Sequence, residues 1–272
     1  MSLLYHSNIF TTVTRSCPGE LLARSTLLST GWEATASINA LSATFVITDA
    51  CWDICRSPGG AHNGGRVVPA LAGVAAGLGS GPALRAAARD EGDLPYRLLA
   101  ECVKGIVQSE TYLFRERGYP DAATYEKSWK ENYTGSCRRY SDSTHQGRSW
   151  YEHVADRAWS DFLFSRVKTA TVTAGADGAL HIDGSFTDSF HGLGARLSVL
   201  GGVVTAAQGG FLRAPDDICT ESAAALAALA GVPLTSLGRE QIFRTIGGEQ
   251  GCVHMADLIT HMLQTFRDTG RG

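Results

Sequence analysis

The sequence contains two similar segments, and this internal repeat limits the folds that the chain can adopt. In each segment an extended, β-branched stretch ends in an Arg-x-Pro tripeptide, at Arg56 and at Arg213. An Ala-rich stretch follows and ends in the same Ala-Gly-Val tripeptide, and a Cys-Val pair then opens another helical stretch at Cys102 and at Cys252. The repeat predicts two halves built from the same supersecondary unit.

The residue pattern within the halves predicts strands that are followed by helices. Apolar residues recur with helical spacing over about 99–117 and 253–266. The Gly201-Gly202 pair is typical of a hairpin turn. We therefore expect an α+β fold, in which each half is an antiparallel sheet followed by two helices. Strands are expected in three alternating, β-branched segments: 35–54, 181–190 and 196–206.

The stretch 119–166 has no counterpart in the other half and is rich in Tyr, Trp and Arg. It is too aromatic for a linker, so we expect a structured insert whose apolar side chains are buried. The chain is predicted to consist of a first half at 1–118, the insert at 119–166 and a second half at 167–272. We expect these parts to pack as one compact unit.

Charge and composition exclude several functional classes. The chain has 24 basic and 27 acidic side chains, so it lacks the basic surface that nucleic acid requires. No apolar run reaches the roughly 20 residues of a membrane helix, and the N-terminus lacks the pattern of a signal peptide. The seven cysteines include no CxxC pair and are interpreted as free thiols. These features predict a cytoplasmic protein that binds neither nucleic acid nor membrane.

Four features stand out in the second half of the chain. They are a strand pair with Asp183 and Asp188, the lone Cys219, the helix end Leu229-Ala230-Gly231, and a Gly-Gly-x-x-Gly-Cys-x-His motif from Gly247 to His254. Through these features residues 178–266 resemble an uncharacterised bacterial family, one of the domains of unknown function, whereas the first half matches only through the duplication. The resemblance implies a shared fold, and it implies an association with bacteria that degrade lignin-derived aromatic compounds.

A weaker resemblance links the chain to iron-sulfur scaffold proteins of the IscU/NifU type. It rests on the strand segment Ile47-Thr48-Asp49-Ala50 and on the order of sheet, Ala-rich helix and Cys/His pair. The three cysteines of those scaffolds have no match in either half. The resemblance therefore implies kinship of fold more than it implies a scaffold function.

The Cys252-Val253-His254 segment is a first candidate for chemistry. A cysteine at a helix N-terminus is favoured as the thiolate by the helix dipole. His254, Asp257 and His261 share one helix face. This face predicts a metal half-site or a proton relay, and the alternative is a helix cap with a packed Cys252.

Lys104 occupies the position that matches His254 in the other half. A desolvated lysine acts as a base or forms an iminium ion, and the alternative is a solvated surface lysine. Glu101 and Glu110 are its expected partners. Arg56 and Arg213 are interpreted either as turn-stabilising residues or as pocket arginines.

The insert carries a candidate substrate site around Tyr140, which we expect to transfer a proton. Arg138 and Arg139 would bind the anion of an aromatic acid or phenol, while Tyr133 and Trp150 would supply stacking surface. The alternative is that these side chains form the insert's own small core.

Metal-binding alternatives follow from the cysteines. Asp49, Cys51, Asp53 and Cys55 would share one face of a strand, although neighbours there lie about 7 Å apart, too far for one metal without a bend. Asp188 and His191 would fall on opposite faces of a strand, so the pattern does not imply a dyad between them. The alternative metal set is Cys252, His254, Cys219, Cys51 and Cys55.

The sequence lacks a phosphate loop, a GxSxG motif, an HExxH motif and a dinucleotide fingerprint. We therefore expect a lyase or isomerase that needs no cofactor and acts by acid-base chemistry on a small aromatic substrate. Lys104, Tyr140 and His254 are the expected catalytic residues. The concrete hypothesis is carbon-carbon cleavage of a lignin-derived phenylpropanoid with release of formaldehyde. The alternatives are a metal or iron-sulfur binding protein and a non-catalytic partner subunit that dimerises. A homodimer is also among the expectations.

Overall fold

The computed structural model describes residues 1–142, 144, 147–149, 152 and 161–271. The chain divides into two compact units. The N-terminal unit consists of Ile9–Tyr125 and Trp150–Arg166, and the C-terminal unit consists of Met1–Asn8, Glu126–Ser149 and Val167–Gly272.

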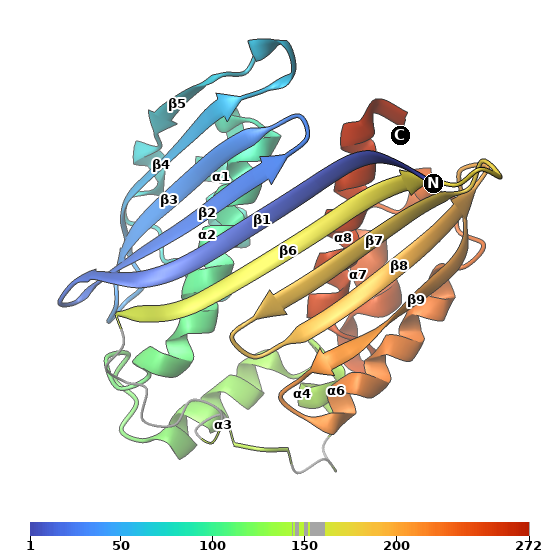
Figure 1. The fold of residues 1–272 in the computed structure, drawn as a ribbon. Coiled ribbons are helices and arrows are strands. Elements are labelled where there is room, and N and C mark those ends of the chain that lie inside the picture. Colours follow the sequence, from blue (N-terminus) through green and yellow to red (C-terminus); the bar gives the residue numbers. More distant parts are fainter. Residues whose placement is uncertain (143, 145–146, 150–151, 153–160, 272) are drawn as a thin grey trace. The chain divides into compact units, whose positions relative to one another are not determined.

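The described residues form nine strands, and the hydrogen-bonded strand order is β5-β4-β3-β2-β1-β6-β7-β8-β9 (Figure 1). Strands β1 and β6 contribute residues to both units. Every pairing from β2 to β5 and from β7 to β9 is antiparallel. The strands are β1 (Ser2–Cys17), β2 (Glu20–Ser29), β3 (Glu33–Leu41), β4 (Ile47–Arg56), β5 (Gly64–Val67), β6 (Phe162–Ala174), β7 (Leu180–Asp188), β8 (Gly192–Leu200) and β9 (Val203–Arg213).

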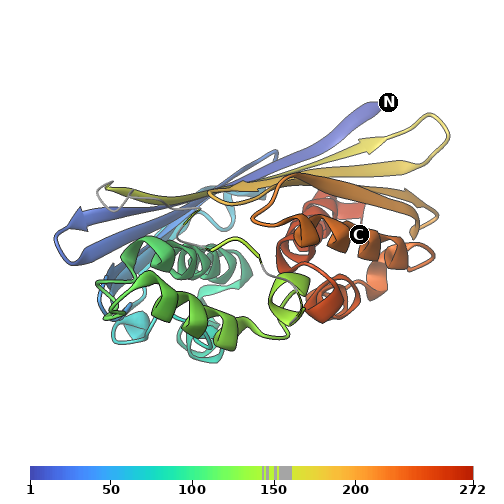
Figure 2. The same ribbon diagram turned by 90° about the horizontal axis from the view of Figure 1, so that it is seen from below.

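In each unit the helices lie on one face of the strands (Figure 2). The α-helices are α1 (Gly81–Ala87), α2 (Asp93–Leu113), α3 (Ala122–Tyr133), α4 (Arg138–Ser141), α6 (Asp217–Glu221), α7 (Arg239–Ile246) and α8 (Val253–Phe266). Short 3-10 segments cover Pro58–Gly60, Pro69–Leu71, Arg89–Glu91, Ser222–Leu229, Leu234–Ser236 and Gly248–Gln250, and a π-helical turn covers Arg267–Arg271.

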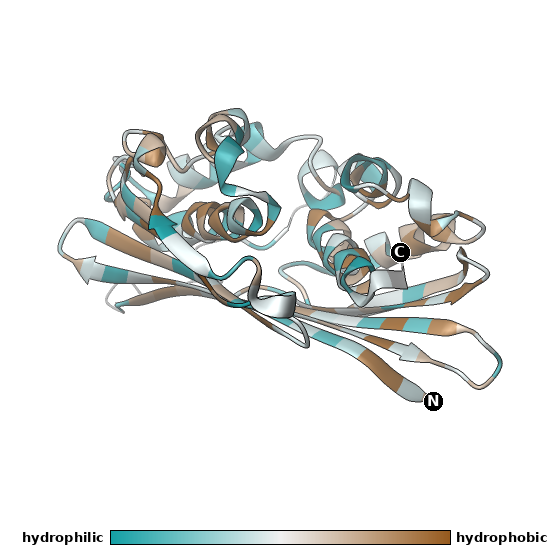
Figure 3. Cartoon of the chain, turned by 90° about the horizontal axis from the view of Figure 1, so that it is seen from above, coloured by the Kyte–Doolittle hydropathy of each residue, from teal (hydrophilic) through white to brown (hydrophobic). Residues whose placement is uncertain are grey.

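Over most of their length, β1, β2 and β3 bury every second side chain. Figure 3 shows hydrophilic and hydrophobic residues in bands along the strands. In the N-terminal unit the long helix α2 packs on β2 and β3. In the C-terminal unit α8 packs on β7 and β8. A Cβ atom at Gly184 of β7 would lie 2.6 Å from the Met262 side chain of α8, so glycine permits this close approach.

The α+β prediction is confirmed. Helix α8 covers the predicted range 253–266, and α2 overlaps the predicted helix at 99–117. Gly201 and Gly202, both at positive φ, form the predicted hairpin turn between β8 and β9. The predicted single strand at 35–54 is instead two strands, β3 and β4, joined by a turn with Phe45 at φ 58°. Whether the halves arose by duplication stays an interpretation.

The predicted insert contributes residues to both units. Tyr125 in the N-terminal unit packs against Phe114 and Tyr119. Residues 126–149, which include α4 and the second half of α3, belong to the C-terminal unit. The buried side chains Tyr125 and Trp129 confirm that this stretch is a structured element and not a linker.

Candidate active site

The loop between β7 and β8 is a tight turn built around one carboxylate. The N–H of Asp188 donates to the C=O of His191 at 2.9 Å. Oδ1 of Asp188 accepts the N–H of Phe190 at 2.8 Å and the N–H of His191 at 2.7 Å. The same oxygen accepts Nδ1–H of the His191 ring at 3.0 Å. Both side chains are buried. The carboxylate therefore fixes the imidazole with Nδ1 protonated, and Nε2 keeps its lone pair.

The side chain of Arg213, the last residue of β9, holds this loop through hydrogen bonds to the main chain of the loop. One guanidinium nitrogen donates to the C=O of Ser189 at 2.9 Å. The other donates to the C=O of Asp188 at 2.6 Å and to the C=O of His191 at 3.1 Å. Of the two roles considered for Arg213, the structure shows the turn-stabilising one.

The glycines of the Gly-Gly-x-x-Gly-Cys-x-His motif set where α8 begins. A Cβ atom at Gly251 would lie 2.1 Å from the C=O oxygen of Ile246, and one at Gly247 would lie 2.6 Å from that of Phe243. Glycine is therefore required for the tight path between α7 and α8. Cys252 is the N-cap residue of α8, and its N–H donates to the C=O of Ile246 at 2.9 Å. This path places His254 in the first turn of α8.

The His254 ring lies against the His191 ring. The two ring centroids are 3.8 Å apart, and the planes are tilted by 30°. The edge of Phe186 also contacts His254, at a centroid separation of 5.4 Å.

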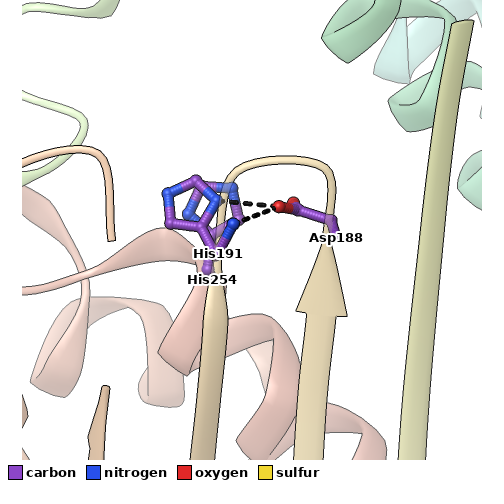
Figure 4. Close-up of side chains that lie close together, drawn as sticks. All are labelled: Asp188, His191 and His254. Atoms are coloured by element: carbon purple, nitrogen blue, oxygen red, sulfur yellow. Dashed lines mark hydrogen bonds and ion pairs between the residues drawn. The ribbon is translucent and has the colours of Figure 1, made fainter. Parts of the chain in front are cut away.

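Asp188, His191 and His254 therefore form one compact cluster (Figure 4). One ligand atom from each of the three residues lies within 4.8 Å of the others. His254 is half-buried, while the other two side chains are buried. Two imidazoles and an orienting carboxylate can accept and return a proton, and the same three groups can bind a metal ion.

The sequence did not imply a dyad between Asp188 and His191, and the structure shows the two side chains in contact. The sequence-based interpretation assumed that one strand continues through residue 190, but β7 ends at Asp188 and the chain reverses. A signal was present in Asp188 itself, because an Asp side chain commonly accepts the N–H groups that follow it in a turn. His254 was predicted as a site residue, and the structure adds Asp188 and His191 as its neighbours.

The predicted reactivity of Cys252 is also wrong. Its side chain is buried beside the start of α8, and this desolvation raises the pKa of the thiol to about 12, although backbone N–H groups of the helix lower it. Burial therefore outweighs the helix dipole, and the thiol is protonated at neutral pH. The sulfur lies 3.9 Å from Nδ1 of His254. Its role is a packed helix cap, which was the alternative.

The rest of the predicted helix face lies in the core. Asp257 pairs with Lys168 of β6, with Nζ and Oδ2 2.9 Å apart and both side chains nearly inaccessible to solvent. His261 is also buried. Asp257 therefore has a cationic partner that the sequence did not indicate, because Lys168 is 89 residues away along the chain.

The aromatic candidates of the insert form a stacked cluster in the C-terminal unit. Tyr133 stacks on Trp129 at 4.4 Å and contacts Tyr140 at 5.5 Å between ring centroids. Nε1–H of Trp129 donates to the Tyr140 hydroxyl at 2.7 Å. Arg139 also donates to this hydroxyl, at 3.1 Å, and forms a short ion pair with the buried Asp216. Arg139 is thus engaged by an acidic partner within the protein.

Arg138 connects α4 to the segment that precedes α8. Its N–H donates to the C=O of Gly251 at 3.0 Å, and its guanidinium contacts Gln250 at 2.8 Å and Glu221 at 2.6 Å. The remaining predicted binding residue of the insert, Trp150, lies outside the described residues.

Lys104 and Arg56 belong to the N-terminal unit. Nζ of Lys104 contacts the expected partner Glu101 at 2.7 Å, and the lysine side chain is about one third exposed. Glu101 also lies 3.8 Å from the buried Arg166. Arg56 donates to main-chain carbonyls of the β2–β3 loop, as Arg213 does in the β7–β8 loop.

The residues of the alternative metal set are distributed over both units. Cys51 and Cys55 lie in the N-terminal unit, whereas Cys219, Cys252 and His254 lie in the C-terminal unit. Among the described residues, the one converging group of three ligand atoms contains no thiol. Burial raises the pKa of Cys219 to about 11.

None of the helices in the described part of the chain is both long and apolar enough to cross a membrane. A family model described as "Protein of unknown function (DUF2889)" matches residues 164–267. No curated protein and no solved structure matches the chain. The matched range contains Asp188, His191 and His254, so the cluster lies within the part of the chain that is similar to this uncharacterised domain family.

Proposed function

We propose that the C-terminal unit carries an acid-base active site in which His191 is the base and His254 the acid. The observation that carries this proposal is the hydrogen bond from Nδ1–H of His191 to Asp188, next to a second imidazole at 3.8 Å. A carboxylate that fixes the tautomer of an imidazole is the arrangement that general-base catalysis uses. The site needs no organic cofactor for this chemistry.

We propose further that the reaction is the carbon-carbon cleavage of a small aromatic substrate of the lignin-derived phenylpropanoid type. Nε2 of His191 would remove the proton from a hydroxymethyl group. The carbon-carbon bond would then break as the C=O of formaldehyde forms, and the electron pair would pass to the carbon beside the aromatic ring. His254 would donate a proton to that carbon. One base and one acid suffice, and the two imidazoles fill these roles.

The aromatic cluster of the same unit supports an aromatic substrate. Trp129, Tyr133 and Tyr140 supply aromatic surface. Arg138, which lies between Tyr133 and Tyr140 along the chain, is hydrogen-bonded to Gly251, three residues before His254. Catalytic roles for Tyr140 and Lys104 and substrate contacts with Arg139 stay predictions, as do a homodimer and a cytoplasmic location. No observation favours the thiol-based metal site or the non-catalytic subunit.

The test is an assay of the full chain with aromatic compounds that carry a hydroxymethyl side chain. Formaldehyde is trapped chemically and the aromatic product is separated by chromatography. We expect wild-type turnover, a decrease of kcat of at least about 100-fold in His191→Gln, and no change in His181→Gln. His181 is a matched control because it lies on β7, the strand that ends at Asp188, and its ring contacts Ser198. Equal kcat values for His191→Gln and wild type would disprove the assignment, and absence of formaldehyde from every substrate would disprove the reaction.

A further inference from the structure

We propose that Asp188, His191 and His254 also bind one divalent metal ion of the zinc class, and that this ion inhibits the acid-base site. The inhibition rests on the proposed function, whereas the binding itself does not. Two imidazoles and one carboxylate are ligands that Zn²⁺ and its neighbours in the transition series accept, while Mg²⁺ and Ca²⁺ prefer oxygen ligands alone.

The distance between Asp188 and His191 already fits a pair of metal ligands. Oδ1 and Nδ1 are 3.0 Å apart. Metal-ligand bonds near 2.1 Å place adjacent ligand atoms roughly 3.0 Å apart in octahedral geometry and roughly 3.4 Å apart in tetrahedral geometry. A metal ion can therefore take the place of the proton that Nδ1 donates to the carboxylate, with little movement of either side chain.

His254 supplies the third ligand. The three ligand atoms lie at most 4.8 Å apart, which exceeds the tetrahedral separation by at most about 1.4 Å. Rotation of the half-buried His254 ring can close this difference, since Asp188 and His191 are fixed by the loop and His254 is the more accessible of the three. The three ligands come from the end of β7, the residue that precedes β8 and the first turn of α8.

The metal ion and the proton compete for the same nitrogen. Binding breaks the hydrogen bond between His191 and Asp188, releases the proton of Nδ1 to solvent and occupies a lone pair of His254. The base then loses its orienting carboxylate and the acid loses its proton. Turnover at the proposed site should therefore fall in proportion to metal occupancy.

The binding test uses the full chain without a polyhistidine tag, treated with chelator and then titrated with Co²⁺ or Zn²⁺. We expect one ion per chain, release of at least one proton measured in buffers of different ionisation enthalpy, and visible absorption bands for Co²⁺. Affinity should fall at least tenfold in His254→Gln and in Asp188→Asn, and should not change in His181→Gln.

Absence of binding by the wild-type chain at millimolar metal would overturn the inference, as would unchanged affinity in the folded His254→Gln variant. Should these variants fail to fold, the wild-type chain still decides the matter, because Co²⁺ bound at this site must shift the NMR signals of the His191 and His254 rings and leave those of His181 in place. Binding without any turnover on aromatic substrates would disprove the proposed function alone. Turnover that is lost in His191→Gln, in a protein that binds no metal, would disprove this inference alone.

Discussion

The β2–β3 loop and the β7–β8 loop share one main-chain design and differ in their chemistry. In the β2–β3 loop the N–H of Ser29 donates to the C=O of Trp32 at 2.8 Å, and the N–H of Trp32 donates to Oγ of Ser29 at 2.9 Å. Asp188 and His191 make the same two contacts in the β7–β8 loop, at 2.9 and 2.7 Å. Only the second loop combines a carboxylate with an imidazole.

The resemblance of the two loops extends to their surroundings. Trp32 stacks on His62 at 5.6 Å between ring centroids, whereas His191 lies 3.8 Å from His254. An arginine side chain also holds each loop. Arg56, at the end of β4, donates to the β2–β3 loop, and Arg213, at the end of β9, donates to the β7–β8 loop. The comparison indicates that the turn requires only an oxygen acceptor at its first position. The carboxylate of Asp188 therefore exceeds the structural need of the turn, which supports a chemical role for it.

The largest effect is expected for Asp188→Ser, which gives the β7–β8 loop the acceptor that Ser29 provides in the other loop. The hydroxyl should preserve the turn but cannot fix the His191 tautomer as a carboxylate does. We expect kcat to fall by about 1,000-fold, or about 4 kcal/mol of activation free energy. Urea unfolding should show a loss of about 1 kcal/mol or less.

The reverse substitution, Ser29→Asp, is the matched control for this experiment. It should leave both turnover and the unfolding midpoint close to wild type. If Asp188→Ser retained wild-type turnover, or lost it only because the protein unfolds, the carboxylate would have no separate chemical role.

A smaller effect on turnover is expected to distinguish Arg213 from Arg56. Arg56→Ala and Arg213→Ala each remove charged hydrogen bonds to three carbonyl groups of a loop. Because both guanidinium groups are partly exposed, we expect each change to lower the free energy of unfolding by about 1–2 kcal/mol. Only Arg213→Ala should also lower kcat, by about tenfold, because the loop it releases carries His191.

Urea unfolding and steady-state kinetics on both arginine variants measure this difference. Equal losses of turnover in Arg56→Ala and Arg213→Ala would mean that the loops contribute equally to the site. Unchanged turnover in both would mean that the position of the β7–β8 loop does not limit the reaction.

The parts of the fold that the sequence predicted best are those with a regular apolar period. Helix α8 was predicted within its observed bounds because its buried side chains recur with strict helical spacing. The turn between β3 and β4 escaped prediction because it contains no glycine, and Phe45 takes the positive φ instead. Strand β1 was not expected either, although every second residue in most of its length is buried.

The candidate site was only partly predictable for a similar reason. His254 was found through its motif, whereas the hydrogen bond between Asp188 and His191 depends on where β7 ends. In a strand that continued to His191 the two side chains would lie on opposite faces, whereas the turn after Asp188 brings them together. The partner of Asp257, Lys168, depends on the packing of α8 against the strands, which no local pattern specifies.

The smallest expected effect concerns the buried cysteines at the repeat positions 102 and 252. Burial raises the pKa of both thiols above the ordinary value of 9.0, that of Cys252 to about 12. Both thiols stay neutral in the folded chain and ionise above pH 9 once the chain unfolds. The buried neutral thiols therefore make their full contribution to the free energy of unfolding below pH 9, and this contribution is lost as the pH rises from 9 toward 12.

Because each thiol ionises in the unfolded chain, we expect it to lower the free energy of unfolding by about 1 kcal/mol as the pH rises from 8 to 10. Cys252→Ala should remove its share of this loss, so that its unfolding free energy changes less with pH than that of wild type. Cys55→Ala is the control, because Cys55 is exposed. Urea unfolding at pH 8, 9 and 10 measures the slopes.

Cys102→Ala and Cys252→Ala should flatten the pH dependence to a similar degree, since these two positions are buried alike even though the loops of the two units differ in chemistry. A steeper slope in Cys252→Ala than in wild type would mean that the thiol ionises in the folded state and belongs to the chemistry of His254.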